Sequence, residues 1–207
     1  MPKIFQIEEE NKSVLVWKIE EPISYFLDQL PIDEKDLPSI WPDRNAQWIT
    51  ARFLLHALIE EPNILKDQYQ KPYLVNDHRY ISISHSYDVA AVIVANKPCG
   101  IDIEKDLPRL QRIASKFITS EDLSKIQTSN TYSDHLYQIW CAKEAMYKAY
   151  GLGQLDFKKN LLLEMNSILK EEKKFTGKLS KENITLTFNL HYEKINQLYH
   201  LVYGTVQ

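Results

Sequence analysis

The chain has 207 residues, 44% of them hydrophobic and 26% charged, a composition typical of a globular protein with a buried core and not of a disordered chain. Its net charge of −3 argues against general affinity for nucleic acid, so an anionic ligand would need a local basic site. Two cysteines are too few for a disulfide framework, and no apolar run approaches the ~20 residues of a membrane span. We therefore expect a cytoplasmic protein without a membrane segment.

The first part of the chain predicts a strand followed by two helices. Residues 14–19 are rich in β-formers, and a short helix follows Pro22. Over residues 43–60 the apolar side chains recur at helical spacing, which predicts a long amphipathic helix. Arg52 lies beside the apolar stripe of this helix and is a candidate to point into a cleft. The alternative is a solvated arginine on the outer face.

Two short extended segments then end in polar residues. Residues 71–75 enter an extended segment through proline, which holds Lys71 in a defined direction. Residues 80–86 alternate as a strand and end with Ser84, His85 and a second serine. These side chains offer several hydrogen-bond donors to a phosphate, and a histidine can carry positive charge near neutral pH. The alternative is an ordinary turn histidine between two serines.

A continuous apolar strand over residues 89–95 leads, through a turn, into residues 100–104, where acidic and apolar residues alternate strictly. On a strand, Asp102 and Glu104 share one face, with Cα atoms about 6.6 Å apart, and the two isoleucines face a core. Two carboxylates at this spacing can converge on one cation.

Further along, a helix is predicted over residues 109–117, and a longer one contains Glu144 and Lys148. Ser133 is the expected N-cap of the longer helix, and Gly151 is the expected stop. Glu144 and Lys148 share a helical face. Taken alone, such a pair is typical of a solvated helix surface.

Together with the strand, the pair indicates a metal site. If the helix lies across the end of the strand, Glu144 supplies a third carboxylate beside Asp102 and Glu104. A cluster of hard oxygen ligands suits Mg²⁺ better than Zn²⁺. No cluster of thiols or imidazoles is evident in the sequence as a competing site.

The chain also predicts a two-part organisation. Each half runs strand, helical region and further strands, with a break near residues 96–98, and residues 184–188 and 199–206 form a closing β-hairpin without assigned chemistry. We expect an α+β protein of two similar α/β lobes, residues 1–98 and 99–207, packed tightly because no flexible linker separates them.

Two motifs extend this interpretation. Gly-Ile-Asp-Ile-Glu at residues 100–104, followed by Trp-Cys-Ala-Lys-Glu-Ala-Met-Tyr-Lys at 140–148, resembles the paired signatures of the 4′-phosphopantetheinyl transferases. With the chain length, Lys-Pro-Tyr at 71–73 and Ile-Ser-His-Ser at 83–86, the chain is similar to the larger, surfactin-type branch. The resemblance implies two pseudo-symmetric lobes in one chain, with the active site in the cleft between them and a monomeric protein.

The resemblance implies Mg²⁺-dependent transfer of the phosphopantetheine arm of coenzyme A to a serine of an apo acyl or peptidyl carrier protein, releasing adenosine 3′,5′-bisphosphate. The N-terminal lobe would contact the nucleotide of coenzyme A, and the C-terminal lobe would hold the metal and catalytic motifs. Asp102, Glu104 and Glu144 would bind Mg²⁺. The residues expected to contact coenzyme A are Arg52, Lys71, Ser84, His85, Lys143 and Lys148.

Within this interpretation Glu144 is the first candidate for the base that accepts the serine proton, and Glu104 is the second. Lys148 would neutralise or protonate the departing phosphate. One departure from the family is Gln70, where glycine often precedes the Lys-Pro pair, and the basic residues expected before the first long helix are reduced to Lys35 and Arg44.

Carrier proteins are usually acidic around their serine, so a docking face would need basic or apolar side chains. Arg109, Arg112 and Lys116 recur on one side of the helix predicted over residues 109–117, which makes it the candidate, although a solvated helix face would look the same. The alternative for the whole chain is a catalytically inactive module that binds coenzyme A and has a regulatory role.

Overall fold

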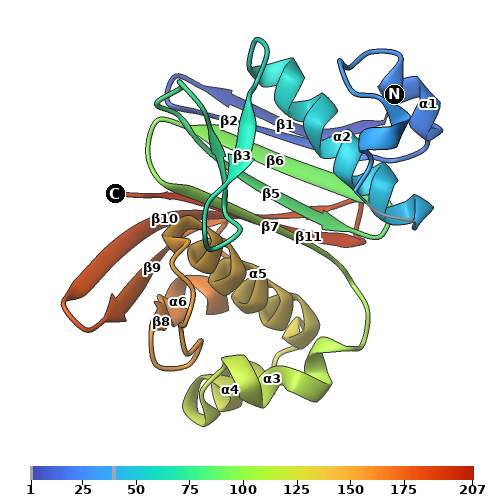
Figure 1. Ribbon diagram of the computed structural model, residues 1–207. Coiled ribbons are helices and arrows are strands. Elements are labelled where there is room, and N and C mark those ends of the chain that lie inside the picture. The colour runs from blue at the N-terminus through green and yellow to red at the C-terminus, as the bar shows by residue number, and fades with distance from the viewer. Residues whose placement is uncertain (1, 39–40) are drawn as a thin grey trace. The chain divides into compact units, whose positions relative to one another are not determined.

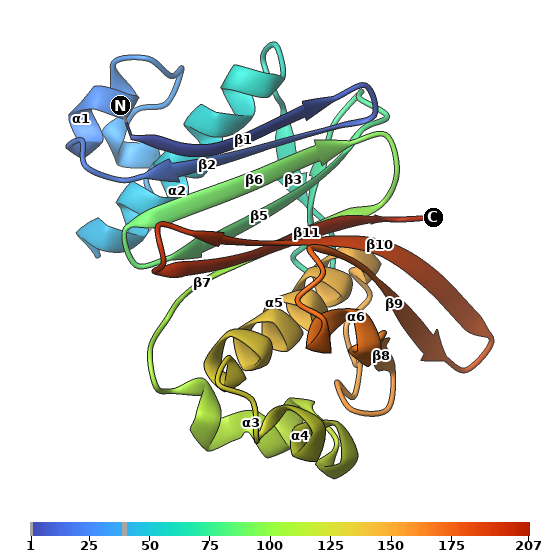
Figure 2. The same ribbon diagram turned by 180° about the vertical axis from the view of Figure 1, so that it is seen from behind.

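The computed structural model describes residues 2–38 and 41–207. The chain divides into two compact units, Met1–Lys97 and Pro98–Gln207, each with a hydrophobic core of its own. In each unit an antiparallel sheet packs against one long helix, and Figures 1 and 2 show this arrangement from two sides. Antiparallel sheets covered by helices make an α+β fold, as the sequence predicted.

The first unit contains a four-stranded antiparallel sheet of order β1-β2-β6-β5 and a separate two-stranded hairpin. The strands are β1 (Lys3–Glu9), β2 (Lys12–Lys18), β3 (Ile64–Lys66), β4 (Pro72–Leu74), β5 (Tyr80–Ser86) and β6 (Val89–Ala95). The helices are α1 (Ile23–Leu27), the 3-10 helix η1 (Glu34–Asp36) and α2 (Pro42–Leu58). β6 is buried along its whole length, as its continuous apolar sequence predicted.

α2 packs on β6 and β2 of this sheet. Leu54 and Leu55 from α2 meet Val92 from β6 in the core, and all three side chains are almost completely buried. β1 was not predicted, because it is an edge strand that buries little and carries glutamine and glutamates between its apolar residues. Sequence periodicity is weak in such a strand.

The second unit contains a five-stranded antiparallel sheet of order β7-β11-β10-β9-β8. The strands are β7 (Cys99–Lys105), β8 (Leu161–Leu163), β9 (Lys174–Lys181), β10 (Ile184–Ile195) and β11 (Tyr199–Val206). The helices are the 3-10 helix η2 (Leu110–Ile113), α3 (Ala114–Phe117), α4 (Ser120–Ile126), α5 (Tyr132–Tyr150) and α6 (Met165–Leu169). β10 and β11 form the closing hairpin that the sequence predicted.

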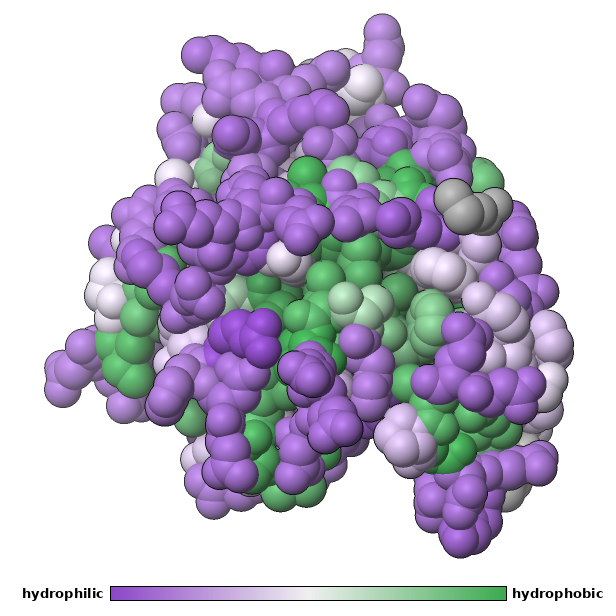
Figure 3. All heavy atoms as spheres, turned by 90° about the horizontal axis from the view of Figure 1, so that it is seen from above, coloured by the Kyte–Doolittle hydropathy of each residue, from purple (hydrophilic) through white to green (hydrophobic). Residues whose placement is uncertain are grey.

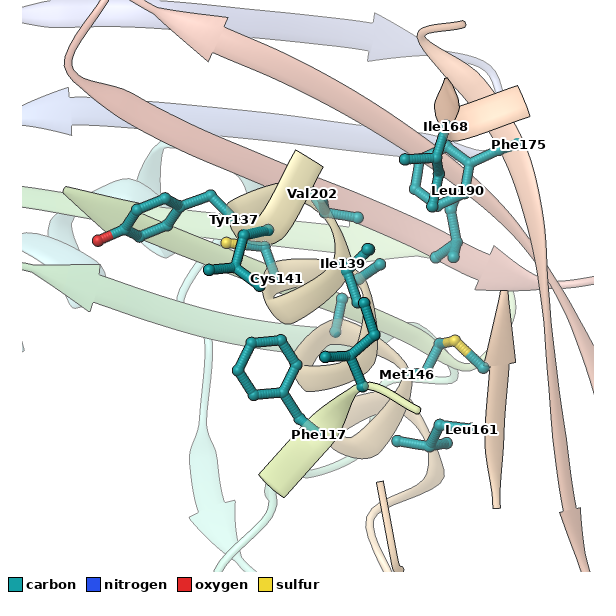
Figure 4. Close-up of a cluster of buried hydrophobic side chains, with 14 of the residues drawn as sticks. Phe117, Tyr137, Ile139, Cys141, Met146, Leu161, Ile168, Phe175, Leu190 and Val202 are labelled. Atoms are coloured by element: carbon teal, nitrogen blue, oxygen red, sulfur yellow. The ribbon is translucent and has the colours of Figure 1, made fainter. Parts of the chain in front are cut away.

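α5 crosses this sheet and packs mainly against β7 and β11. Its apolar face enters the core shown in Figure 4, where Cys141 and Met146 lie among side chains from the strands and from α3. Gly100 lets the helix approach β7, since a Cβ at this position would collide with the carbonyl oxygen of Ala145. Gly151 ends α5 with a φ of 77°, the left-handed conformation that glycine adopts readily.

Two local predictions differ from the structure, and the strand β9 was not predicted. Ser133 lies inside α5, and Thr131 takes the N-cap position, so that Asp134 falls in the first turn. Residues 109–117 form a 3-10 turn and the short helix α3 in place of one continuous helix. The lysine- and glutamate-rich stretch before residue 182 contains β9, whose alternate buried residues are hidden by the charged residues between them.

The surface is mostly polar, although some large side chains remain exposed. Figure 3 shows one face on which hydrophilic side chains predominate and hydrophobic ones reach the surface in places. Among the described residues, no helix is both long enough and apolar enough to cross a membrane. Cys99 and Cys141 are free thiols and both are buried.

Candidate active site

β7 and α5 place the predicted carboxylates on one side of the second sheet. Ile101 and Ile103 are 0% and 1% exposed, and the alternation of β7 turns Asp102 and Glu104 to the opposite face. Side chains from α5 reach both carboxylates, so α5 covers this face. Asp102 is only 5% exposed, and this burial makes its charge depend on nearby cations.

Lys148 is the cation beside Asp102. Its ammonium donates to Oδ1 of Asp102 at 2.7 Å and to the main-chain oxygen of Ile101 at 3.0 Å. The lysine is therefore fixed inside the carboxylate cluster by two hydrogen bonds to β7. Its proposed contact with a phosphate remains a prediction.

Glu104 is held from two sides. The guanidinium of Arg109 donates to Oε2 at 2.5 Å, and the indole N–H of Trp140, on α5, donates to Oε1 at 3.3 Å. The Arg109 side chain is half exposed, so this pair is open to solvent. Trp140 is one helical turn before Glu144, so its hydrogen bond connects Glu104 to the helix that carries Glu144.

Glu144, on α5, has a strongly raised pKa. Burial, together with the negative charges of Asp102 and Glu104, raises its pKa to about 7, although Lys148 opposes the shift. The charges of Asp102 and Glu104 therefore act on Glu144, and a metal ion held by all three remains a prediction. The three carboxylates have two cationic partners, Lys148 and Arg109, which leaves an excess of negative charge. Hard oxygen donors of this kind fit Mg²⁺.

Lys143 is held by main-chain oxygens on α3 and in the loop that follows α5. Its side chain is buried, and its ammonium donates to the main-chain oxygens of Phe117 at 2.8 Å and Phe157 at 2.7 Å. Burial lowers its pKa to about 8. The lysine therefore ties α5 to the end of α3 and to the loop around residue 157, and its contact with coenzyme A remains a prediction. The sequence placed it beside Glu144 but gave no sign of these carbonyl partners.

In the first unit, Arg52 lies on α2, where its own helix holds it. The guanidinium stacks over the Trp48 ring at 3.7 Å from the centroid, and Nη1 donates to the Trp48 main-chain oxygen at 3.3 Å. Burial lowers the pKa of Arg52 to about 10, which still leaves it charged at neutral pH. Its role as a nucleotide contact remains a prediction.

Lys71 precedes β4 at the end of a tight loop. Asp67 caps this loop, since its Oδ1 accepts from the main-chain N–H of Lys71 at 2.9 Å. Gln70 has a φ of 67°, so it adopts the left-handed conformation that a glycine would take at this position. Gln70, which stands where the family often has glycine, therefore keeps the same turn, at a cost in backbone strain of about 1 kcal/mol.

Lys71 also lines a cavity of about 400 Å³, together with Tyr73, Tyr80, His78 and Arg79. His78 and Arg79 were not predicted as site residues. Their position directly before a predicted strand could have indicated them. Arg79 is engaged by Asp77 through two hydrogen bonds to Oδ2, at 3.1 and 2.7 Å. The cavity combines cations with aromatic rings, which suits a nucleotide.

Ser84 and His85 lie near the end of β5 and face opposite sides of the sheet. Ser84 is buried, whereas His85 is exposed on the same strand face as Ile81, which packs against α2. His85 and Arg52 therefore belong to the layer on one side of the first sheet. Their shared contact with the nucleotide end of coenzyme A remains a prediction.

The structure also brings together residues that the sequence did not connect. Asp106, Asp134 and His200 offer ligand atoms within 4.8 Å of one another. His200 from the closing hairpin reaches two aspartates that are far from it in the sequence.

Comparisons with known proteins agree with this reading of the second unit. The profile of the 4′-phosphopantetheinyl transferase superfamily matches residues 98–201, half of the chain, which include β7, α5 and the three predicted metal ligands. A 4′-phosphopantetheinyl transferase from Bacillus subtilis is 35% identical over 89 residues, 42% of this chain and 40% of the relative.

The transferase gsp from Aneurinibacillus migulanus is 32% identical over 107 residues, 49% of this chain and 45% of the relative. The transferase Sfp from Bacillus subtilis strain 168 is 30% identical over 89 residues, 42% of this chain and 40% of the relative. The matches thus span less than half of each of these relatives. Because the superfamily profile covers half of the chain and includes the carboxylate strand and helix, this protein belongs to the 4′-phosphopantetheinyl transferase superfamily.

Proposed function

We propose that this protein transfers the 4′-phosphopantetheine arm of coenzyme A to a serine of an apo acyl or peptidyl carrier protein. The observation that carries the proposal is that the charges of Asp102 and Glu104, on β7, act on Glu144, on α5, which has a pKa of about 7. Asp102, Glu104 and Glu144 would hold Mg²⁺. When bound, this ion would neutralise charge on the diphosphate of coenzyme A.

In the reaction, the serine oxygen forms a bond to the phosphorus that carries the pantetheine arm. The bond from this phosphorus to the bridging diphosphate oxygen breaks, and adenosine 3′,5′-bisphosphate leaves. The serine proton needs an acceptor, and Glu144 is the first candidate for this general base. Glu104 is the second candidate. Lys148, fixed beside Asp102, is placed to balance charge in the cluster.

The nucleotide end of coenzyme A is assigned to the first unit, with Arg52, Lys71, Ser84 and His85 as contacts. Support comes from the charged state of Arg52 and from the cavity with cations and aromatic rings beside Lys71. Dephospho-coenzyme A, which lacks the 3′-phosphate, tests this assignment. Compared with coenzyme A, it should have a much higher KM for the wild type and a similar KM for His85→Ala. An equal rise in KM for both proteins would exclude His85 as a 3′-phosphate contact.

The carrier protein is proposed to dock on η2 and α3, where Arg112 and Lys116 are exposed. Lys116 lines an open cavity of about 330 Å³ with Phe117, Phe157 and Trp140. Trp140 also donates to Glu104, so the cavity is adjacent to the carboxylate cluster. An acidic partner fits such a basic and apolar surface. Because one chain carries both the proposed nucleotide contacts and the proposed metal ligands, we propose a monomer. The two buried free thiols suit a cytoplasmic location.

The test is incubation of the protein with coenzyme A, Mg²⁺ and a panel of apo carrier proteins from fatty-acid, polyketide and peptide synthesis, followed by intact-mass measurement. We expect at least one carrier to gain one phosphopantetheine group, with one adenosine 3′,5′-bisphosphate released per product and none when Mg²⁺ is chelated. Binding of coenzyme A without transfer to any carrier would favour the inactive regulatory module.

A further inference from the structure

A second group of potential metal ligands lies at the other end of α5. Asp106 follows β7, Asp134 is in the first turn of α5, and His200 is on β11. One ligand atom from each lies within 4.8 Å of the others. Asp134 and Glu144 are ten residues apart on one helix, which separates them by about 15 Å, so the two groups are distinct.

His200 is the unusual member, because it is completely buried. Its ring stacks on Tyr137 with centroids 4.4 Å apart, and its Nδ1 lies 2.8 Å from the Tyr192 hydroxyl. Its Nε2 lies 3.3 Å from Oδ2 of Asp106, within ion-pair distance, and makes no hydrogen bond of good geometry among the described residues. Buried polar atoms are rarely left in this state, so the atom points to a missing ligand.

We propose that Asp106, Asp134 and His200 bind a divalent transition-metal ion such as Zn²⁺. An imidazole among carboxylates favours such ions over Mg²⁺ and Ca²⁺, which prefer oxygen ligands throughout. Zinc ligands lie about 2.0–2.2 Å from the ion, which places neighbours in a tetrahedron about 3.3–3.5 Å apart. The 3.3 Å between Nε2 of His200 and Oδ2 of Asp106 matches this separation.

The atoms around the cluster meet the needs of such a site. Metal-binding histidines donate their other ring N–H to a fixed partner, and the Tyr192 oxygen can accept from Nδ1 of His200. Asp106 and Asp134 are 31% and 30% exposed, so water can complete the coordination. Asp134 and Tyr192 also line a cavity of about 220 Å³, which gives an ion a path of entry.

Lys194 is the competing cation. Its ammonium lies 2.6 Å from Oδ1 of Asp134 and lines the same cavity. In the metal-free protein, this lysine offsets part of the charge that the ion would neutralise. A bound ion would connect the end of β7, the start of α5 and β11, and would therefore stabilise the two elements that carry the carboxylate site.

The test is equilibrium dialysis of the full chain against Zn²⁺ in the presence of excess Mg²⁺. We expect one Zn²⁺ per chain in the wild type and in Glu144→Gln, in which the carboxylate site is altered. Asp106→Asn, Asp134→Asn and His200→Gln should lose this ion, and His191→Gln, outside the cluster, should keep it. Lys194→Met should bind at least about tenfold more tightly, because it removes the competing ammonium.

Two results would overturn the proposal. If neither the wild type nor Lys194→Met retains Zn²⁺, Lys194 is the permanent counter-charge and the cluster is an ion pair only. If Asp106→Asn and Asp134→Asn retain as much Zn²⁺ as the wild type, the ion binds elsewhere. Circular dichroism checks folding, and Asp134→Asn decides the matter should the buried His200→Gln variant not fold. None of these measurements depends on transferase activity.

Discussion

The two ends of α5 hold acidic groups that differ in how their charge is balanced. Near the C-terminal end, Asp102, Glu104 and Glu144 adjoin, and burial with mutual repulsion raises the pKa of Glu144 to about 7. At the N-terminal end, Asp134 pairs with Lys194 of the chain itself, at 2.6 Å. Lys194 thus offsets part of the charge of the second group, whereas in the first group the negative charges of Asp102 and Glu104 also act on Glu144. The difference indicates which group depends on an added cation for the proposed reaction.

The largest expected effect is on activity. Asp102→Ala and Glu144→Ala should each reduce transfer to a carrier protein by about 100-fold or more, because each removes a ligand of the proposed metal site. Asp134→Asn, at the other end of the helix, should stay within about threefold of wild type. Intact-mass assays with circular dichroism measure both. Near wild-type activity in either alanine variant would break the comparison.

The next effect concerns the scaffold of the carboxylate site. Gly100→Ala should lower the free energy of unfolding by more than about 2 kcal/mol, since its Cβ meets the main-chain oxygen of Ala145, which cannot move aside. Gly177→Ala is the matched control, because its Cβ meets the flexible Met146 side chain, and it should cost less. Urea unfolding gives both values, and equal losses would contradict this account of the helix–strand approach.

How far the sequence predicts this site follows from its periodicity. Strict alternation located β7, and helical spacing located α5. The sequence therefore predicted which residues share a face with each carboxylate on its own strand or helix. The contacts of Lys143 and His200 were not predicted, because they join residues far apart in sequence. Main-chain carbonyl groups occur at every residue, so the sequence cannot show which two of them accept hydrogen bonds from Lys143. β9 was missed for a similar reason, since its lysines masked the buried alternation.

A third effect is on stability against pH in the absence of Mg²⁺. Glu144 has a pKa of about 7 in the folded protein and a lower one when unfolded, so the folded state binds the proton more tightly. Stability from this group is therefore full below about pH 4.5 and is lost as the pH rises to about 7. Glu144→Gln should remove the loss and be more stable than wild type at pH 8, by up to about 3 kcal/mol. Thermal unfolding at pH 5 and pH 8 checks this, and a variant less stable at pH 8 would contradict it.

The smallest effect lies in the first unit, away from both clusters. Gln70→Gly should stabilise the protein by at most about 1 kcal/mol, since glycine relieves the left-handed backbone but loses more entropy on folding. Asn76, with a φ of 60°, gives a matched control, because asparagine tolerates this conformation and Asn76→Gly should change less. Denaturant midpoints compare the two. A loss above about 1 kcal/mol at Gln70 would mean that its side chain has a stabilising role.

The most direct test of the central claim is a titration of the Glu144 carboxyl group by NMR, assigned by comparison with Glu144→Gln. Without divalent metal, the group should titrate near pH 7, as its burial beside Asp102 requires. Saturating Mg²⁺ should lower this midpoint by more than about one unit, because a nearby cation favours the charged carboxylate. A midpoint that Mg²⁺ leaves unchanged would contradict the assignment of Asp102, Glu104 and Glu144 as the metal site.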